Sequence, residues 1–137
     1  MSPGRVLVDT SSWVEALRAD GRGDVRTRVQ EILVSGQAVV CDMVLLELWN
    51  GARGDQERRK LSRLEAELEV LPTSDEIWAL ARRLAQRARE RGRTFPAADI
   101  LIAACAVGNG AEIEAVDEHI EHLRKIASDV TRSRERE

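Results

Sequence analysis

The sequence predicts an α/β fold in which helices cover both faces of a mostly parallel central sheet. Two observations support this prediction. Short apolar runs alternate along the chain with stretches that carry a helical stripe of apolar residues, and two of the runs end on an aspartate. Continuous apolar runs are typical of parallel strands, because such strands are buried on both faces. With 137 residues, the chain suits one domain around one core, arranged as a three-layer α/β/α sandwich.

The first half of the chain predicts two strands and three helices. Residues 5–9 and 37–41 are apolar runs of strand length. The helices are expected over residues 12–18, 25–34 and about 43–53. Asp42 suits the N-cap of the third helix, and Gly54 suits its end.

The middle of the chain is predicted to be mostly helical. Residues 57–68 predict a helix, and residues 69–71 a short extended piece that is closed by Pro72. The stretch Thr73-Ser74-Asp75-Glu76 matches a capping box and predicts that another helix begins there. The apolar stripe of that helix consists of Ile77, Leu80, Leu84 and Ala88.

A helix that is apolar all round is expected at the centre of the core. It begins near Pro96, is apolar throughout residues 100–107, and ends at Gly108-Asn109-Gly110. Residues 112–116 then predict a strand, and a last helix follows. We expect the domain to cover residues 1–130 and the tail, residues 131–137, to be frayed.

Composition narrows the possible functions. The formal charge is −3, from 21 basic and 24 acidic residues. Proteins that only bind nucleic acid usually carry a strongly basic surface, so this composition argues against that class. No apolar stretch approaches the roughly 20 residues that span a membrane, and no signal-peptide pattern opens the chain. Cys41 and Cys105 suit small core residues in a reducing compartment. These features predict a cytoplasmic protein with no membrane partner.

Four acids occupy positions where such folds bind ligands. Asp9 ends the first strand, and Asp117 ends the last one. Asp99 lies in the first turn of the central helix, and Glu47 lies one turn into the helix after the second strand. Ligands of open α/β sheets bind beyond the carboxyl ends of the strands. The four acids can therefore meet at one edge of the sheet.

Four carboxylates at one edge repel one another unless a cation lies between them. Two unit charges 4 Å apart interact by about 4 kcal/mol at an effective dielectric constant near 20. Carboxylates, retained waters and substrate phosphates are the usual ligands of Mg²⁺, which would resolve this conflict. No His/Cys cluster has zinc spacing, and we expect His119 and His122 to be solvated on the last helix.

Each acid also has a purely structural explanation. Asp9 and Asp117 could cap the helices that follow them, although Thr10 or its serine neighbours could cap the first helix instead. Asp99 could complement a helix amino end, and Glu47 could be one glutamate on an amphipathic helix. The four acids taken together favour a site more strongly than any one of them.

Six arginines lie between residues 82 and 93. The helix dipole alone favours arginines near a helix carboxyl end. The same side chains could contact RNA phosphates, and Arg87 and Arg91 are the candidate contacts.

Three stretches together carry a family resemblance: VLVDTSSW around Asp9, LLELWNGA around Glu47, and FPAADILIAACAVGNGAEIEAVDEHI around Asp99 and Asp117. In order and spacing, and over nearly the whole chain, they resemble the PIN-domain ribonucleases, specifically the VapC-type toxins of bacterial toxin-antitoxin pairs. The resemblance implies that these four acids form the catalytic and metal-binding quartet. It also implies a PIN-like fold and a supporting role for Ser11.

The same resemblance implies a function. It predicts a Mg²⁺- or Mn²⁺-dependent endoribonuclease that hydrolyses RNA phosphodiester bonds and inhibits growth. It further implies a homodimer and a cognate VapB-type antitoxin whose tail occupies the site. The chain departs from the family pattern around the last acid. Members often carry Thr or Ser two residues before that acid and Phe three after it, where this chain has Ala115 and Ile120.

Rival classes match the sequence less well. A receiver domain places two adjacent acids after its first strand, and a phosphatase with an aspartyl nucleophile requires Asp-x-Asp, where this chain has Ser11. The alternatives are a catalytically silent PIN-like scaffold and another Mg²⁺-dependent phosphohydrolase. A nuclease assay that compares Mg²⁺ with EDTA separates the enzyme from the scaffold.

Overall fold

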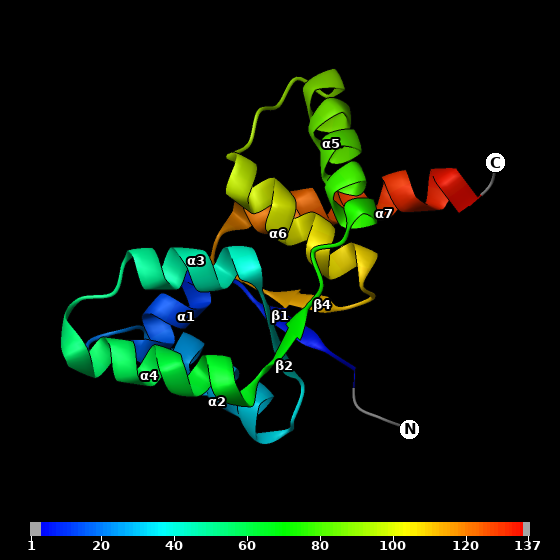
Figure 1. Cartoon of the computed structure of the whole chain (residues 1–137). Coiled ribbons are helices and arrows are strands. Elements are labelled where there is room, and N and C mark those ends of the chain that lie inside the picture. The colour runs from blue at the N-terminus through cyan, green and yellow to red at the C-terminus, as the bar shows by residue number, and fades with distance from the viewer. Residues whose placement is uncertain (1–3, 136–137) are drawn as a thin grey trace.

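The chain folds around one four-stranded sheet, in which every pairing is parallel (Figure 1). The structure is a computed structural model and describes residues 4–135, without the side chains of the last two of these. The strands are β1 (Val6–Val8), β2 (Ala38–Cys41), β3 (Glu69–Leu71) and β4 (Glu112–Glu114), in the order β3-β2-β1-β4. In the centre of the sheet, Val6 lies opposite Ala38 on one side and Glu112 on the other.

Two groups of helices enclose this sheet (Figure 1). The helices are α1 (Thr10–Leu17), α2 (Gly23–Val34), α3 (Asp42–Asn50), α4 (Gly54–Glu67), α5 (Asp75–Glu90), α6 (Ala97–Gly108) and α7 (Glu118–Glu135). Helices α5, α6 and α7 pack on one another, whereas α1 packs on α2 and α3. The predicted α/β/α sandwich with a parallel central sheet is confirmed. Among residues 4–135, no helix is both long and apolar enough to cross a membrane.

Helix α6 lies in the middle of the core, as its composition predicts. Residues 101–106 are all buried, and together with Leu7 and Val8 of β1 they belong to one continuous cluster of apolar side chains. A helix buried on every side cannot reposition itself without unpacking the core. The side chains that α6 carries at its first turn are therefore held rigidly relative to the sheet.

Three predicted helix ends differ in detail from the structure, each for a local reason, although α5 does begin within the predicted capping box, at Asp75. Helix α3 ends at Asn50, and Gly54 instead begins α4, where its φ of 74° suits a residue without a Cβ. Asp42 is the first residue of α3 and not its cap, because the helix follows β2 directly and Cys41 occupies the cap position. The cap of α5 is Ser74, whose hydroxyl accepts the N–H of Ile77, so the capping box does not form at the predicted register.

The carboxyl-terminal part differs from expectation at one strand. β4 ends at Glu114, so a short connection and not the strand itself carries Asp117. Helix α7 is continuous to Glu135. The predicted fraying of residues 131–137 stays a prediction, and residues 136–137 lie outside the described part of the chain.

Candidate active site

The most deeply buried of the four acids is Asp9, which directly follows the last residue of β1. Asp9 follows Val8 directly, its backbone N–H donates to the carbonyl of Glu114 at 2.8 Å, and it is only 4% exposed. Its carboxylate caps α1 by accepting the backbone N–H of Ser11 at 3.2 Å and the Ser11 hydroxyl at 2.7 Å. Both bonds from Ser11 reach Oδ2, which leaves Oδ1 as the oxygen that can bind a cation.

Ser11 connects the end of β1 with the segment after β4. Its hydroxyl donates to Asp9 and accepts the backbone N–H of Val116 at 3.4 Å. Val116 directly precedes Asp117. One side chain therefore helps to set the positions of two of the four acids relative to each other.

Glu47 is anchored by a residue that sequence reasoning treated only as a possible cap. The Thr10 hydroxyl donates to Glu47 Oε1 at 2.7 Å. Because Thr10 follows Asp9 in the chain, this bond ties α3 to the end of β1. The half-buried carboxylate of Glu47 is thereby turned toward the same edge of the sheet as Asp9.

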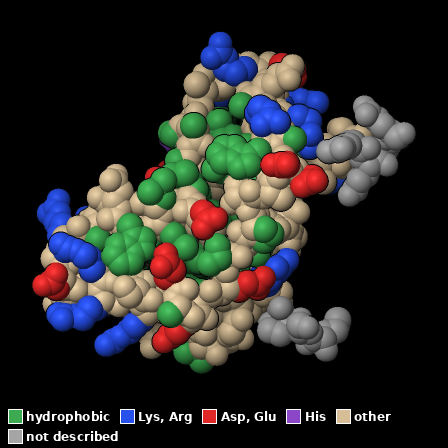
Figure 2. All heavy atoms as spheres, viewed as in Figure 1, with side chains coloured by type: hydrophobic (Ala, Val, Ile, Leu, Met, Phe, Trp, Pro, Cys, Tyr) green, Lys and Arg blue, Asp and Glu red, His purple; other side chains and the backbone are tan. Residues whose placement is uncertain are grey.

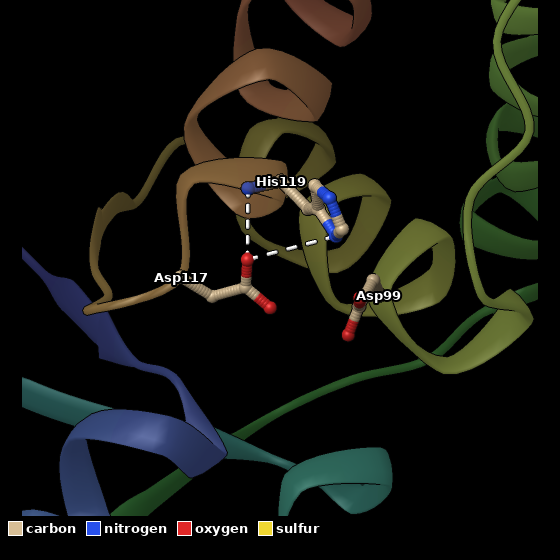
Figure 3. A group of neighbouring side chains, drawn as sticks. All are labelled: Asp99, Asp117 and His119. Atoms are coloured by element: carbon tan, nitrogen blue, oxygen red, sulfur yellow. Dashed lines mark hydrogen bonds and ion pairs between the residues drawn. The ribbon is translucent and has the colours of Figure 1, made fainter.

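A cluster of three side chains lies where α6 and α7 begin. Figure 3 shows its members, Asp99, Asp117 and His119, gathered there. Ligand atoms of these three residues all lie within 4.8 Å of one another. Asp117 Oδ1 accepts the backbone N–H of His119 at 2.9 Å, and its distance to His119 Nδ1 is 3.7 Å. The side chains of Asp117 and His119 are 39% and 53% exposed, so the cluster is open to solvent.

The four acids lie near enough for their charges to interact, although only Asp99 and Asp117 belong to the tight group with His119. Burial raises the pKa of Asp99 to about 6, and repulsion from Asp9, Asp117 and Glu47 adds to the effect. Burial also raises the pKa of Asp9, while the hydrogen bonds from Ser11 oppose that rise and the charge of Asp117 reinforces it. Each acid of the predicted quartet thus contributes to a single electrostatic field.

This donor set fits a divalent cation. The carboxylates supply the oxygen ligands that Mg²⁺ and Mn²⁺ prefer. In the part of the chain that the structure describes, no Lys or Arg forms an ion pair with any of the four. Apart from His119 beside Asp117, their negative charge is left without a basic partner among these residues, which is unfavourable unless a cation or protons offset it.

The surroundings of the site are partly apolar. Figure 2 shows acidic side chains between two apolar areas that lie over α3 and α5, with basic side chains toward the ends of the molecule. The candidate RNA contacts lie apart from this cluster, at the carboxyl end of α5. Arg87 pairs with Glu90 at 3.3 Å, and Arg91 pairs with Asp129 at 3.2 Å.

Comparison with known proteins agrees with this architecture. Residues 6–126 match the PIN domain family. The chain belongs to this family. The PIN domain is 32% identical over 128 residues to the "VapC ribonuclease Mb1587" of Mycobacterium bovis, covering 90% of this chain and 94% of that protein. Its identity to "Ribonuclease VapC11" of Mycobacterium tuberculosis is also 32%, with the same coverage of both chains.

Solved structures resemble the PIN domain in fold. One is the structure of FitAB bound to the IR36 DNA fragment, with a TM-score of 0.71 and 20% identity, covering 86% of this chain and 89% of that one. Another is VapBC2 from Rickettsia felis bound to a DNA fragment from its promoter. Its TM-score is 0.68 at 18% identity, with 82% and 86% of the two chains covered.

Sequence reasoning missed two side chains of the site. His119 is exposed, as expected, but it also lies beside Asp99 and Asp117, which was not predicted. Thr10 holds Glu47. The signal for His119 was its position two residues after Asp117 at the start of a helix, where its side chain stays close to the preceding acid.

Proposed function

We propose that the chain is a metal-dependent endoribonuclease and the toxin of a VapBC-type toxin-antitoxin pair, acting in the cytoplasm and inhibiting growth by cutting RNA. The observation that carries this proposal is the convergence of four acids, none of them ion-paired with a Lys or Arg among the described residues, in a PIN domain related to VapC ribonucleases. A metal between the acids offsets the repulsion that a purely structural use of them leaves in place.

Each acid has a distinct role in this proposal. Asp9 and Asp99 hold Mg²⁺ or Mn²⁺, which when bound supplies a Lewis acid and lowers the pKa of a water. Glu47, fixed by Thr10, orients the attacking water, and Asp117 completes the ligand set. Ser11 keeps the Asp9 carboxylate turned toward the site.

Two surfaces support the proposed protein partners. A cleft of about 380 Å³ beside Glu47 has apolar walls and basic side chains that suit a segment of a VapB-type antitoxin. Its lining includes Val14, Leu17, Leu48, Leu61, Arg18, Arg53 and Lys60. Apolar side chains on α3 and α5 are exposed, namely Leu46 at 61% and Trp78 at 47%, which supports a homodimer.

The decisive experiment for the proposed activity is metal removal. We expect the purified chain to cleave RNA in Mg²⁺ or Mn²⁺, to stop in excess EDTA, and to recover when the metal is restored. Gel analysis of a structured RNA measures the cleavage, and an Asp99→Asn preparation purified in parallel controls for contaminating nucleases. Cleavage that persists in EDTA contradicts the metal-dependent mechanism, and the absence of cleavage in every metal supports the silent scaffold.

A second experiment tests the RNA contacts proposed for Arg87 and Arg91. Replacing both by Gln should weaken RNA binding and reduce the slope of log K against log salt by about 0.7 for each phosphate contact that is lost. Binding is measured in the Asp99→Asn background, so that the RNA stays intact. The matched control is Arg58→Gln, which removes an ion-paired arginine from α4. An unchanged slope would mean that Arg87 and Arg91 serve only their ion pairs with Glu90 and Asp129.

A further inference from the structure

We propose that His119 is a ligand of the cation held between Asp99 and Asp117, and that its imidazole increases the preference of the site for Mn²⁺ over Mg²⁺. This inference rests on the proposed function, since it assumes that the acids bind a catalytic cation. Mg²⁺ is a hard cation that prefers oxygen ligands, whereas imidazole nitrogen suits first-row transition metals. A nitrogen ligand therefore distinguishes the two ions where carboxylates alone do so only weakly.

The geometry brings the imidazole into the ligand set. Asp99, Asp117 and His119 each have one potential ligand atom within 4.8 Å of those of the other two. Small movements of these side chains would bring all three atoms to one ion. The capping bond to Asp117 uses the backbone N–H of His119 and leaves the imidazole free. Its Nδ1 lies 3.7 Å from Asp117 Oδ1, which is too long for a good hydrogen bond.

The ring is also held in place by its neighbours. The ring of Phe95 packs against it edge to face, with centroids 5.7 Å apart and an angle of 80°. Phe95 is buried, and the guanidinium of Arg93 lies 4.9 Å from its centroid. Phe95 lies just before α6, the helix that carries Asp99. The same packing that positions the start of α6 therefore positions the imidazole, and a ligand that is already ordered loses less entropy on binding.

The second histidine of α7 provides a matched control. His122 Nδ1 contacts a guanidinium nitrogen of Arg93, so His122 is engaged away from the acids. It does not belong to the group of side chains placed to share an ion. Replacing His122 by Asn changes the same residue type on the same helix without removing the proposed ligand.

The test measures metal binding directly, with the full chain freed of metal. Calorimetric titration gives the Kd of Mn²⁺ and of Mg²⁺ for the wild type, His119→Asn and His122→Asn. We expect His119→Asn to weaken Mn²⁺ binding by at least about tenfold and to change Mg²⁺ binding far less, because even an indirect partner of a metal costs about that much. Electron spin echo spectra of bound Mn²⁺ should show coupling to a ¹⁴N nucleus in the wild type and in His122→Asn, but not in His119→Asn.

Each outcome bears on a distinct claim. If His119→Asn weakens the binding of both ions by the same factor, or if the ¹⁴N coupling survives in this variant, His119 is not a selective ligand and this inference is overturned. If the wild type binds neither ion, or if Asp99→Asn binds both as well as the wild type does, the proposed metal-dependent function fails along with it. Melting curves in EDTA show whether the exposed His119 can be replaced without loss of the fold.

Discussion

Asp99→Asn is expected to lose RNA cleavage and growth inhibition while the protein remains folded. The amide keeps the size of the side chain but removes the charge that binds the cation at the start of α6. Losing a direct metal ligand should lower the cleavage rate by about a hundredfold or more. Initial rates on a defined RNA at saturating Mg²⁺ measure the effect, and growth after induction provides a second readout.

A control separates loss of the site from loss of any negative charge near it. Glu118→Gln removes an exposed carboxylate next to Asp117, in the first turn of α7, and should leave the rate nearly unchanged. Circular dichroism establishes that both variants are folded. Wild-type rates in a purified Asp99→Asn sample would remove Asp99 from the active site.

The same substitution should change the pH dependence of stability in metal-free protein. The pKa of Asp99 rises from 3.8 to about 6 on folding, so between these values the folded chain holds more protons than the unfolded chain. Stability must therefore fall as the pH rises through this window, and Asp9 acts in the same direction. Urea midpoints between pH 4 and pH 7 in EDTA should decline less steeply for Asp99→Asn than for the wild type.

Asp9→Asn is expected to affect stability with opposite signs in two buffers. In EDTA the variant should melt at a higher temperature, because the buried Asp9 carboxylate is repelled by Asp99 and Asp117 and the neutral amide is not. In Mg²⁺ the wild type gains RT ln(1 + [L]/Kd), about 2.7 kcal/mol at a hundredfold excess over Kd, and the variant loses most of that gain. Melting curves of both proteins in both buffers measure the change.

The capping role of Asp9 does not obscure this comparison. Asn caps a helix about as well as Asp, and an amide oxygen can accept both hydrogen bonds that Ser11 donates. Asp24→Asn is the matched control, since it neutralises an exposed aspartate in the first turn of α2. A constant difference between Asp9→Asn and the wild type in EDTA and in Mg²⁺ would leave Asp9 as a cap alone.

The sequence was sufficient to predict the sheet and the place of Asp9 at the end of β1, because both depend on local patterns; the roles of the four acids stay a prediction. An apolar run such as Val6–Val8 predicts a buried strand wherever it occurs, and the carboxyl ends of parallel strands share one edge. The capping explanations for Asp9 and Asp117 also hold, and they are compatible with a metal site because each carboxylate has two oxygens.

The remaining features of the site depend on contacts between distant segments. The packing of His119 against Phe95 joins the starts of two helices, and the bond from Thr10 to Glu47 joins the end of β1 to α3. Neither of these two contacts produces a periodic pattern in the sequence. The start of α4 was misplaced for a different reason, since Gly54 is compatible with ending one helix or with beginning the next.

The burial of α6 determines how an enzyme of this kind can be switched off. Asp99 is attached to the innermost helix of the domain, whose buried residues can shift only when the core opens, and such global openings are the rarest fluctuations of a folded protein. Moving the backbone of α6 as a device for inactivation would therefore carry the cost of unpacking the core. Control from outside, by covering the acids or by withholding the cation, avoids that cost, and the supply of an inhibitor then sets the amount of active protein.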